Sequence, residues 1–311
     1  MLGSFRNYID LTVGAGAYLI SKVLKSGMAQ NLTPLDNISK LSPIVTRILG
    51  QNPSSFTLLG TNTYLVGSGE KKVLIDTGEK NIPKYIDCLK EALGKNTIDS
   101  IIITHWHGDH VGGIPDILKI VNRKIPIYKI KRPDVEVENL SDLYNYVEDG
   151  YVVETEGATL KMIATPGHTQ DHAVVYLEEE KTLFSGDCVL GEGTSVFEDL
   201  YTYMNSLNIL LSLNPEKIYP GHGPVITSPK DKITEYIKHR NQREEQILKC
   251  LEGKEYMTSM DITNDVYTDI NLSLKIGAWN NVKNHLTKLL KEKKIIEISS
   301  DRFKLNTEIS F

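Results

Sequence analysis

Three histidines and one aspartate fall within six positions of the stretch THWHGDHVGG, residues 104–113. The whole chain has only 8 histidines, so this concentration indicates a binding site. Imidazole nitrogens and carboxylate oxygens together suit a divalent cation such as zinc. His105 and His107 are two positions apart, and on an extended chain such side chains point the same way, so that the two can share one metal ion.

Further along the chain, three glycine-bearing loops each carry one more side chain that can bind a metal. His168 occurs in ATPGHT, Asp187 in FSGDC and His222 in YPGHG, and each follows a short apolar run. Glycine lets the backbone turn tightly, so each side chain can reach the edge of a sheet. The donor set predicts a centre for two metal ions, in which Asp187 bridges a first group and a second group: His105, His107 and His168, and then Asp109, His110 and His222.

These motifs are flanked by segments with the periodicity of strands and helices. FTLLGTNTYLVGSGEKKVLIDTG predicts two or three strands, SIIIT (100–104) predicts a short buried strand, and IPKYIDCLKEALG predicts a helix. Four more strand-like runs follow, ATLKMIATPGH, HAVVYL, KTLFSGD and EKIYPGHG, with helical patterns at FEDLYTYMNSLNILLSL and DKITEYIKHRNQREEQILKCL. Strands separated by helices, with polar residues at the strand ends, predict an α/β layered core whose site lies along one edge.

The motifs HxHxDH at 105–110, PGH ending at 168, GD ending at 187 and GHG around 222 resemble those of the metallo-β-lactamase superfamily of hydrolases. This resemblance covers roughly residues 45–245 and implies an αββα sandwich that holds two zinc ions bridged by a hydroxide. It also implies that Asp76, in LIDTG, supports the metal ligands from behind. GTNTYLVG, LIDTGE, GDCVLGEGT and FEDLYTYMNSL, with the tail, look like the β-lactamase-like protein 2 group, which implies a mitochondrial endoribonuclease acting on single-stranded RNA.

The ligand set also indicates which chemistry to expect. Two cations roughly 3.5–4 Å apart supply hydroxide near pH 7, and they can clamp the oxygens of a phosphate or polarise a carbonyl. Asp109 is expected to orient the nucleophile while it binds the second metal. The sequence shows no evident acid for the leaving group. His172, in HTQDH, is a candidate for that role, with a structural histidine that caps a strand as the alternative.

The chain is expected to have three parts: an N-terminal extension (1–44), a metallo-β-lactamase domain (45–240) and a winged-helix-like domain (241–311). In the last part NQREEQILKCL, SMDITNDVY and WNNVKNHLTKLLKEKK predict helices, and KIIEIS and RFKL predict a hairpin. The third helix has an apolar face, Val282, Leu286, Leu289 and Leu290, which leaves three lysines outward, Lys283, Lys288 and Lys291. These lysines form either a solvated face or a surface that contacts the backbone of RNA.

Composition limits the class of protein. The chain is 40% hydrophobic and 24% charged, as is ordinary for globular domains, and its net charge of −5 gives no overall attraction for nucleic acid. Three widely spaced cysteines, Cys88, Cys188 and Cys250, fit no disulfide framework and indicate buried thiols in a reducing compartment.

The first 30 residues are basic and poor in acids, and their apolar core is too short to span a bilayer. They suit a mitochondrial transit peptide, and therefore a matrix protein. The alternative is an extension ahead of a second start at Met28 in a cytoplasmic protein.

Three functions compete for this set of residues. A zinc-dependent endoribonuclease of single-stranded RNA is favoured, and a homodimer is compatible with the sequence without being predicted by it. A thioester or other acyl hydrolase resembling glyoxalase II has the same HxHxDH ligands, but that family ends in a helical tail. A nonenzymatic RNA- or protein-binding module is disfavoured by the intact set of seven ligands. Only 35 positions separate Asp187 from His222, too few for the inserted cap of RNA-maturation nucleases in the superfamily.

Overall fold

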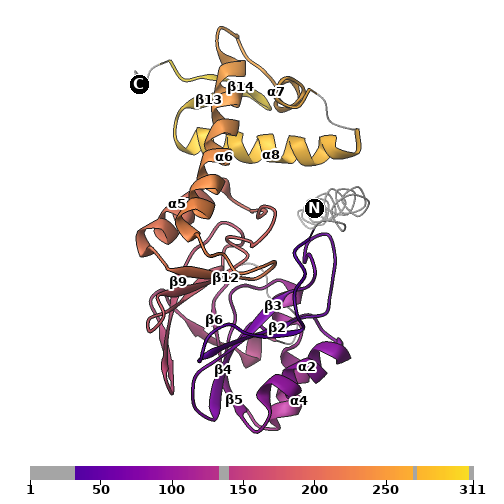
Figure 1. Ribbon diagram of the computed structural model, residues 1–311. Helices are drawn as coiled ribbons and strands as arrows, with labels where there is room; N and C mark the ends of the chain where they lie inside the picture. The colour runs from indigo at the N-terminus through magenta and orange to yellow at the C-terminus, as the bar shows by residue number, and fades with distance from the viewer. Residues whose placement is uncertain (1–31, 133–139, 269–271, 308–311) are drawn as a thin grey trace. The chain divides into compact units, whose positions relative to one another are not determined.

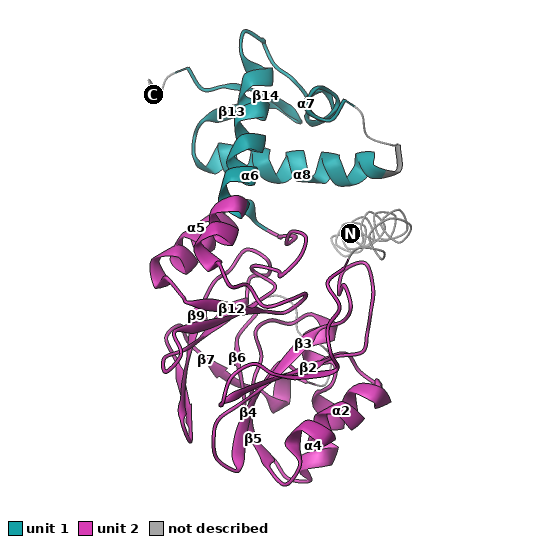
Figure 2. Cartoon of the chain, in the orientation of Figure 1, with its two compact units in different colours: residues 1–31, 199–201, 236–311 teal, residues 32–198, 202–235 magenta. Residues whose placement is uncertain are grey.

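The computed structural model describes residues 32–132, 140–268 and 272–307. The expected transit peptide, residues 1–30, lies outside the described residues. The chain divides into two compact units (Figure 2). One, called here the sandwich unit, comprises residues 32–198 and 202–235, and the other, the tail unit, includes residues 199–201 and 236–311.

The first sheet of the sandwich unit has seven strands in the order β1-β2-β3-β4-β5-β6-β7 (Figure 1). Strands β1 to β4 pair antiparallel, and β4 to β7 pair in parallel. β5, the buried strand expected from SIIIT, ends shortly before His105. β1 falls inside the segment expected to precede the domain, and it joins the sheet by pairing with β2. The bounds are β1 (Ile38–Lys40), β2 (Val45–Leu49), β3 (Asn62–Val66), β4 (Lys71–Ile75), β5 (Thr97–Ile102), β6 (Ile127–Ile130) and β7 (Asn145–Val147).

The second sheet has five strands in the order β12-β11-β10-β9-β8. All neighbours pair antiparallel except β11 and β12, which are parallel. The two sheets share one apolar core, in which the rings of Tyr64 and Phe184, from different sheets, lie 5.0 Å apart. The bounds are β8 (Val152–Thr155), β9 (Ala158–Ala164), β10 (Ala173–Leu177), β11 (Thr182–Gly186) and β12 (Lys217–Pro220).

Helices cover the outer faces of the sheets. α2 (Pro83–Leu93), α3 (Gly108–Val111) and α4 (Ile114–Val121) pack with the first sheet in a second core cluster. α2 begins at a proline in its first turn and buries Tyr85 and Leu89, the face that the helical spacing predicts. α5 (Leu200–Leu213) lies beside β9 and β12 in Figure 1, and the α5 hydroxyls of Tyr203 and Ser206 donate to backbone carbonyls in loops beside β11 and β9. The expected α/β sandwich is therefore confirmed.

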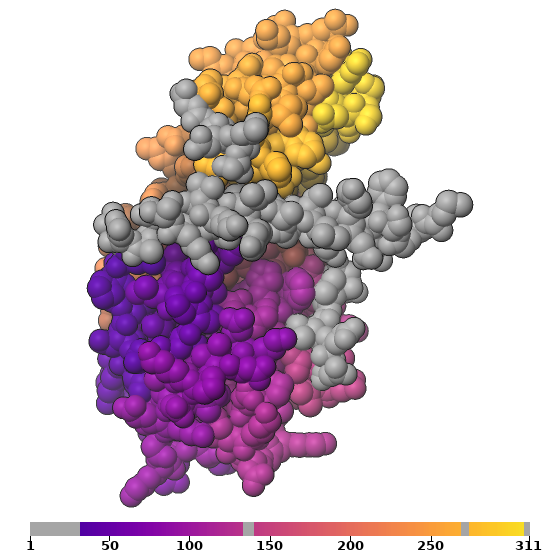
Figure 3. Space-filling model, turned by 90° about the vertical axis from the view of Figure 1, so that its right-hand side faces the viewer, coloured from indigo at the N-terminus to yellow at the C-terminus, as the bar shows by residue number. Residues whose placement is uncertain are grey.

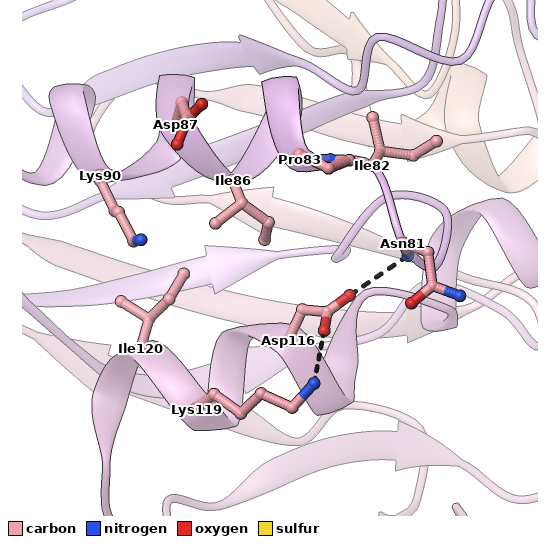
Figure 4. Close-up of a pocket in the computed structure, with 9 residues that line it drawn as sticks. All are labelled: Asn81, Ile82, Pro83, Ile86, Asp87, Lys90, Asp116, Lys119 and Ile120. Atoms are coloured by element: carbon pink, nitrogen blue, oxygen red, sulfur yellow. Dashed lines mark hydrogen bonds and ion pairs between the residues drawn. The ribbon is translucent and has the colours of Figure 1, made fainter.

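In the side view of Figure 3, the indigo to purple first half of the sandwich unit and its magenta second half form one continuous surface. A groove of about 500 Å³ lies between α2 and α4 (Figure 4). Its apolar lining includes Ile86 and Ile120, and at one side Asp116 accepts hydrogen bonds from the backbone of Asn81 and from Lys119. No residue expected to bind metal lines this groove.

The tail unit has the expected three helices and hairpin. Residues 236–251 belong to α6 (Pro229–Leu251), followed by α7 (Ser259–Val266), α8 (Leu272–Lys291), β13 (Ile295–Ser299) and β14 (Arg302–Leu305). A capping box between Thr258 and Asp261 begins α7. All of these elements contribute to one core. In the described residues no helix is long and apolar enough to cross a membrane.

The outward orientation expected for Lys288 is wrong. Its side chain is 7% exposed, and it forms ion pairs with Glu244 of α6 and, at 2.7 Å, with Glu292. The buried face of α8 is therefore wider than its apolar stripe, because an acid from another helix neutralises the lysine. Lys283 is exposed as expected and lies over the ring of Trp279 at 4.5 Å. Lys291 is also exposed and is paired with Asp199.

His285 gives the tail unit a stability that depends on pH. It is 1% exposed, and among the described residues neither of its ring nitrogens has a hydrogen-bond partner. Burial, with the nearby Arg240 and Lys288, lowers its pKa to about 3. Because the unfolded chain takes up this proton near pH 6.5 and the folded chain does not, acidification favours unfolding.

We expect His285→Leu to lose less stability on acidification than the unchanged chain. Between pH 7 and pH 5 the difference should reach about 2 kcal/mol. Urea unfolding of both proteins at the two pH values measures it, and every other titrating group cancels in the comparison. Parallel losses in both proteins would contradict the prediction.

Candidate metal centre

The structure brings the seven expected ligands into two groups. Within each group the ligand atoms lie within 4.8 Å of one another. His105 follows β5 of the first sheet, and Asp187 and His222 follow β11 and β12 of the second sheet. Both sheets therefore supply ligands at their strand ends. The first group is His105, His107, His168 and Asp187, and the second is Asp109, His110 and His222.

Asp187 faces the two groups with different oxygens. Its Oδ2 lies 3.7 Å from His168 Nε2 and 4.0 Å from His105 Nε2. Its Oδ1 lies 3.2 Å from His222 Nε2 and 3.5 Å from His110 Nε2. A carboxylate that presents one oxygen to each group is able to bridge a pair of metal ions.

The donor atoms fit a metal better than they fit one another. His107 Nδ1 lies 3.0 Å from His105 Nε2 and 3.2 Å from His168 Nε2, so three ring nitrogens converge on one point. Among the described residues, the buried atoms His110 Nε2 and Asp187 Oδ1 have no hydrogen-bond partner. Buried polar atoms without partners are costly, and a bound cation would satisfy them.

Burial and charge set the protonation states of the metal ligands. Burial, with the neighbouring His168, lowers the pKa of His107 to about 3, so His107 is neutral at pH 7. Burial also disfavours a charged Asp187, yet His222 and His110 hold the pKa of its carboxyl well below the usual range. Burial likewise opposes protonation of His222, but Asp187 and Asp109 raise its pKa to about 10. Metal binding at the second group therefore displaces a proton from His222.

Two glycines keep space open around Asp187. A Cβ at Gly221 would lie 2.4 Å from Asp187 Oδ1, and a Cβ at Gly186 would lie 2.8 Å from His172 Nε2. Gly186 also has a φ of 47°, in the left-handed region that favours glycine. These clashes explain why glycine, and no larger residue, precedes Asp187 in the GD motif and His222 in the GHG motif.

Asp76 lies behind the ligands, where the family resemblance implies it. Its Oδ2 is 2.8 Å from His110 Nδ1, and its two oxygens accept from the backbone N–H and the hydroxyl of Thr104. The Thr104 hydroxyl is in turn 3.0 Å from His105 Nδ1. Asp76 has a left-handed φ of 58°, an uncommon conformation that its hydrogen bonds help to hold.

Sequence reasoning missed the support of Asp109. The Thr61 hydroxyl donates to Asp109 Oδ2 at 2.8 Å, and the Asn52 amide donates to that hydroxyl at 3.1 Å. Both residues are buried polar side chains. Thr61 stands in the stretch GTNTYLVG, which does not point to Asp109, and Asn52 lies before that stretch.

The structure contradicts the candidate role of His172 as an acid for the leaving group. Its ring is 1% exposed, Nδ1 is hydrogen-bonded to the Thr165 hydroxyl at 2.9 Å, and Nε2 accepts from the backbone N–H of Asp187 at 3.2 Å. With both nitrogens engaged and the ring buried, His172 has no free nitrogen to offer to a leaving group. It orients the loop that carries Asp187.

The chain resembles known proteins over most of its length. Residues 56–222 match the model of the metallo-beta-lactamase superfamily, and residues 258–304 match that of the beta-lactamase associated winged helix domain. A beta-lactamase-like protein 2 homolog of Caenorhabditis elegans is 55% identical over 267 residues, which are 84% of this chain and 89% of the relative. The homolog of Drosophila melanogaster is 47% identical over 268 residues, 83% of this chain and 91% of the relative.

Two other relatives extend this comparison. An atrochrysone carboxyl ACP thioesterase of Cryptosporiopsis is 43% identical over 229 residues, 73% of this chain and 68% of the relative. The crystal structure of a beta-lactamase domain protein from Burkholderia ambifaria has a TM-score of 0.72 at 16% identity, covering 90% of this chain and 99% of that one, which supports the fold alone. The shared fold, the clustered metal ligands and these relatives together show that the chain belongs to the metallo-β-lactamase superfamily of hydrolases, close to β-lactamase-like protein 2.

Proposed function

We propose that the chain is an endoribonuclease that binds two zinc ions and hydrolyses phosphodiester bonds of single-stranded RNA. The main support for a two-metal site is the position of Asp187, because one of its oxygens faces His168 and the other faces His222. Two such cations make hydroxide available from water near pH 7 and stabilise charge on phosphate oxygens. The basic, acid-poor first 30 residues support a place in the mitochondrial matrix.

Asp109 is the residue that orients the attacking water. Its side chain is 21% exposed, compared with 12% for Asp187. Oδ2 is fixed by the Thr61 hydroxyl and lies 3.3 Å from His110 Nε2 and 3.4 Å from His222 Nε2. Asp109 thus combines a fixed oxygen with access to solvent, as a residue that orients a water molecule requires.

The tail unit supports RNA as the substrate. A winged helix is a fold that binds nucleic acid in many proteins, although a fold alone does not decide function. Lys283 over Trp279 and Arg302 over Tyr256, at 4.5 Å each, place cations beside aromatic rings. Cations contact phosphates and aromatic rings stack on bases, so such pairs suit a single strand. Lys288 has no part in this surface because it is buried.

Thioester hydrolysis is the second candidate. Three relatives named as atrochrysone carboxyl ACP thioesterases are 41–44% identical over 71–73% of this chain. The same donor set would polarise a thioester carbonyl as well as a phosphate.

A direct comparison of substrates separates the two functions. The zinc-loaded chain should cleave a labelled single-stranded RNA and leave a glutathione thioester and an acyl-ACP thioester intact. His107→Ala should lose the cleavage, and Arg123→Ala, which removes an exposed arginine paired with Asp99, should keep it. Turnover of a thioester with intact RNA would overturn the proposal.

The salt dependence of RNA binding tests the surface of the tail unit. With Lys283→Ala and Lys291→Ala together, the slope of log affinity against log salt should become less steep by about 0.7 for each lysine. Lys119→Ala, on α4 of the sandwich unit, is the matched control. An unchanged slope would show that these lysines do not contact RNA. It would not bear on the nuclease activity, which the cleavage assay tests separately.

A further inference from the structure

We propose that a buried network of charges around Asp171 holds the three histidines of the first group in place and sets their affinity for metal. These histidines, His105, His107 and His168, are called here the three-histidine group. The network consists of Lys129, Arg132, Asp171 and Glu198, and it is called here the Asp171 network. The inference depends on the proposed binding of two metal ions and is independent of the substrate.

The centre of the network is a fully buried ion pair. Lys129 belongs to β6, and its Nζ lies 2.8 Å from Asp171 Oδ2, with both side chains 0% exposed. Burying two charges costs desolvation energy, which their attraction often only offsets, so such a pair is weak evidence for a role in stability. A requirement for one defined geometry is a better reason for its presence.

Arg132 extends the network towards the metal ligands. Its Nη1 lies 3.8 Å from Asp171 Oδ1 and 3.0 Å from Glu198 Oε1. Its guanidinium lies over the ring of Trp106, 4.8 Å from the ring centre. A guanidinium is suited to this position, because it can pair with carboxylates in its plane and stack on an aromatic face.

Each end of the network reaches a segment that carries a ligand of the three-histidine group. Trp106 stands between His105 and His107, and its ring centre is 5.3 Å from that of His107. Asp171 lies three residues after His168, in the loop between β9 and β10. The backbone N–H of Glu198 donates to the carbonyl of His168 at 3.2 Å.

The segment before Glu198 also contacts His168 directly. The Val196 carbonyl accepts from His168 Nδ1 at 2.7 Å, which fixes the ring with Nε2 towards the metal site. Arg132, which follows β6, therefore contacts three other loops. It lies over Trp106 after β5, and it faces Asp171 after β9 and Glu198 after β11.

The second group rests on different residues. Asp76 orients His110, and Thr61 with Asn52 orients Asp109. None of these three belongs to the Asp171 network. A change in the network should therefore weaken one metal-binding step and spare the other.

The test measures zinc binding to the metal-free chain in a series of chelator buffers. We expect Arg132→Met to weaken one of two binding steps by about 10- to 100-fold, as is typical for residues that support a ligand, with the other step unchanged. Thr61→Val removes the support of Asp109 and should weaken the binding step that Arg132→Met leaves unchanged. The two variants together therefore show which step belongs to which ligand group. Arg123→Met, an arginine paired with Asp99 at 2.8 Å and 43% exposed, is the matched control.

Equal weakening of both steps, or binding like that of Arg123→Met, would overturn the proposal. A double variant, Lys129→Met with Asp171→Leu, replaces the buried pair by apolar side chains and should show the same selective loss. Arg132→Lys keeps the charge without the planar fork and takes the place of Arg132→Met if that variant does not fold. Weakening of only one zinc-binding step in Arg132→Lys supports the inference, and unchanged zinc binding in this variant contradicts it.

Discussion

Replacing Asp187 by asparagine is expected to abolish hydrolysis and to remove at least one metal ion. Asparagine keeps the shape of the side chain but lacks the charge and the second carboxylate oxygen that the two histidine groups face. The fall in kcat/KM should exceed the 10- to 100-fold loss typical of a residue that only supports a ligand. Steady-state kinetics and elemental analysis of the purified protein measure both effects.

Asp116→Asn is the matched control for this change. Asp116 is also an aspartate with hydrogen-bonded oxygens, but it lines the groove between α2 and α4 and contacts no ligand of the metal centre. It should keep full activity and metal content. Retention of both ions and of full activity in Asp187→Asn would exclude Asp187 as a bridge.

Removing the metal is expected to lower the stability of the sandwich unit by about 5 kcal/mol, if each of two ions is present at about 100 times its dissociation constant. Without metal, ring nitrogens of His105 and His168 lie within 3.2 Å of His107 Nδ1 with no cation between them. The buried atoms His110 Nε2 and Asp187 Oδ1 also have no hydrogen-bond partner among the described residues. At about 2–4 °C for each kcal/mol, the melting temperature should fall by about 10–20 °C. Melting with and without a chelator gives the shift.

The two tryptophans of the chain allow each unit to be followed separately. Trp106 is next to the ligands and Trp279 is on α8, so Trp279→Phe leaves a reporter in the sandwich unit and Trp106→Phe leaves one in the tail unit. The chelator should shift the first transition and not the second. Equal shifts at both reporters, or none at Trp106, would contradict a metal centre confined to the sandwich unit.

Much of the architecture could be predicted because it depends on local patterns. The spacing of Ile82, Tyr85 and Leu89 marks α2, and the hairpin and three helices of the tail unit follow from periodicity within each segment. The seven ligand types were likewise readable, since histidines and aspartates at glycine turns after short strands are typical of metal ligands at a sheet edge. The predicted division of the six other ligands is the one found in space, with Asp187 beside the first group.

The roles of single polar residues could not be predicted in this way. Lys288 lies on the polar side of the α8 pattern, yet Glu244, 44 positions earlier, neutralises it in a buried pair. His172 looks like a free histidine beside a ligand motif, but Thr165 and the backbone of Asp187 engage both of its nitrogens. Periodicity shows which face of an element is apolar, and it contains no information about a partner on another element.

The sequence by itself determined the family, the layered fold and the set of atoms offered to a metal, because each depends on residue types at short spacings. Only the tertiary structure decided how these atoms are held. The Thr61 support of Asp109 spans 48 positions, and the link from Arg132 to Glu198 spans 66. Thr61 and Asp109 meet only after the strands of the first sheet have paired, and Arg132 and Glu198 only after the two sheets have packed together. For that reason the support of the metal centre became visible in the folded chain alone.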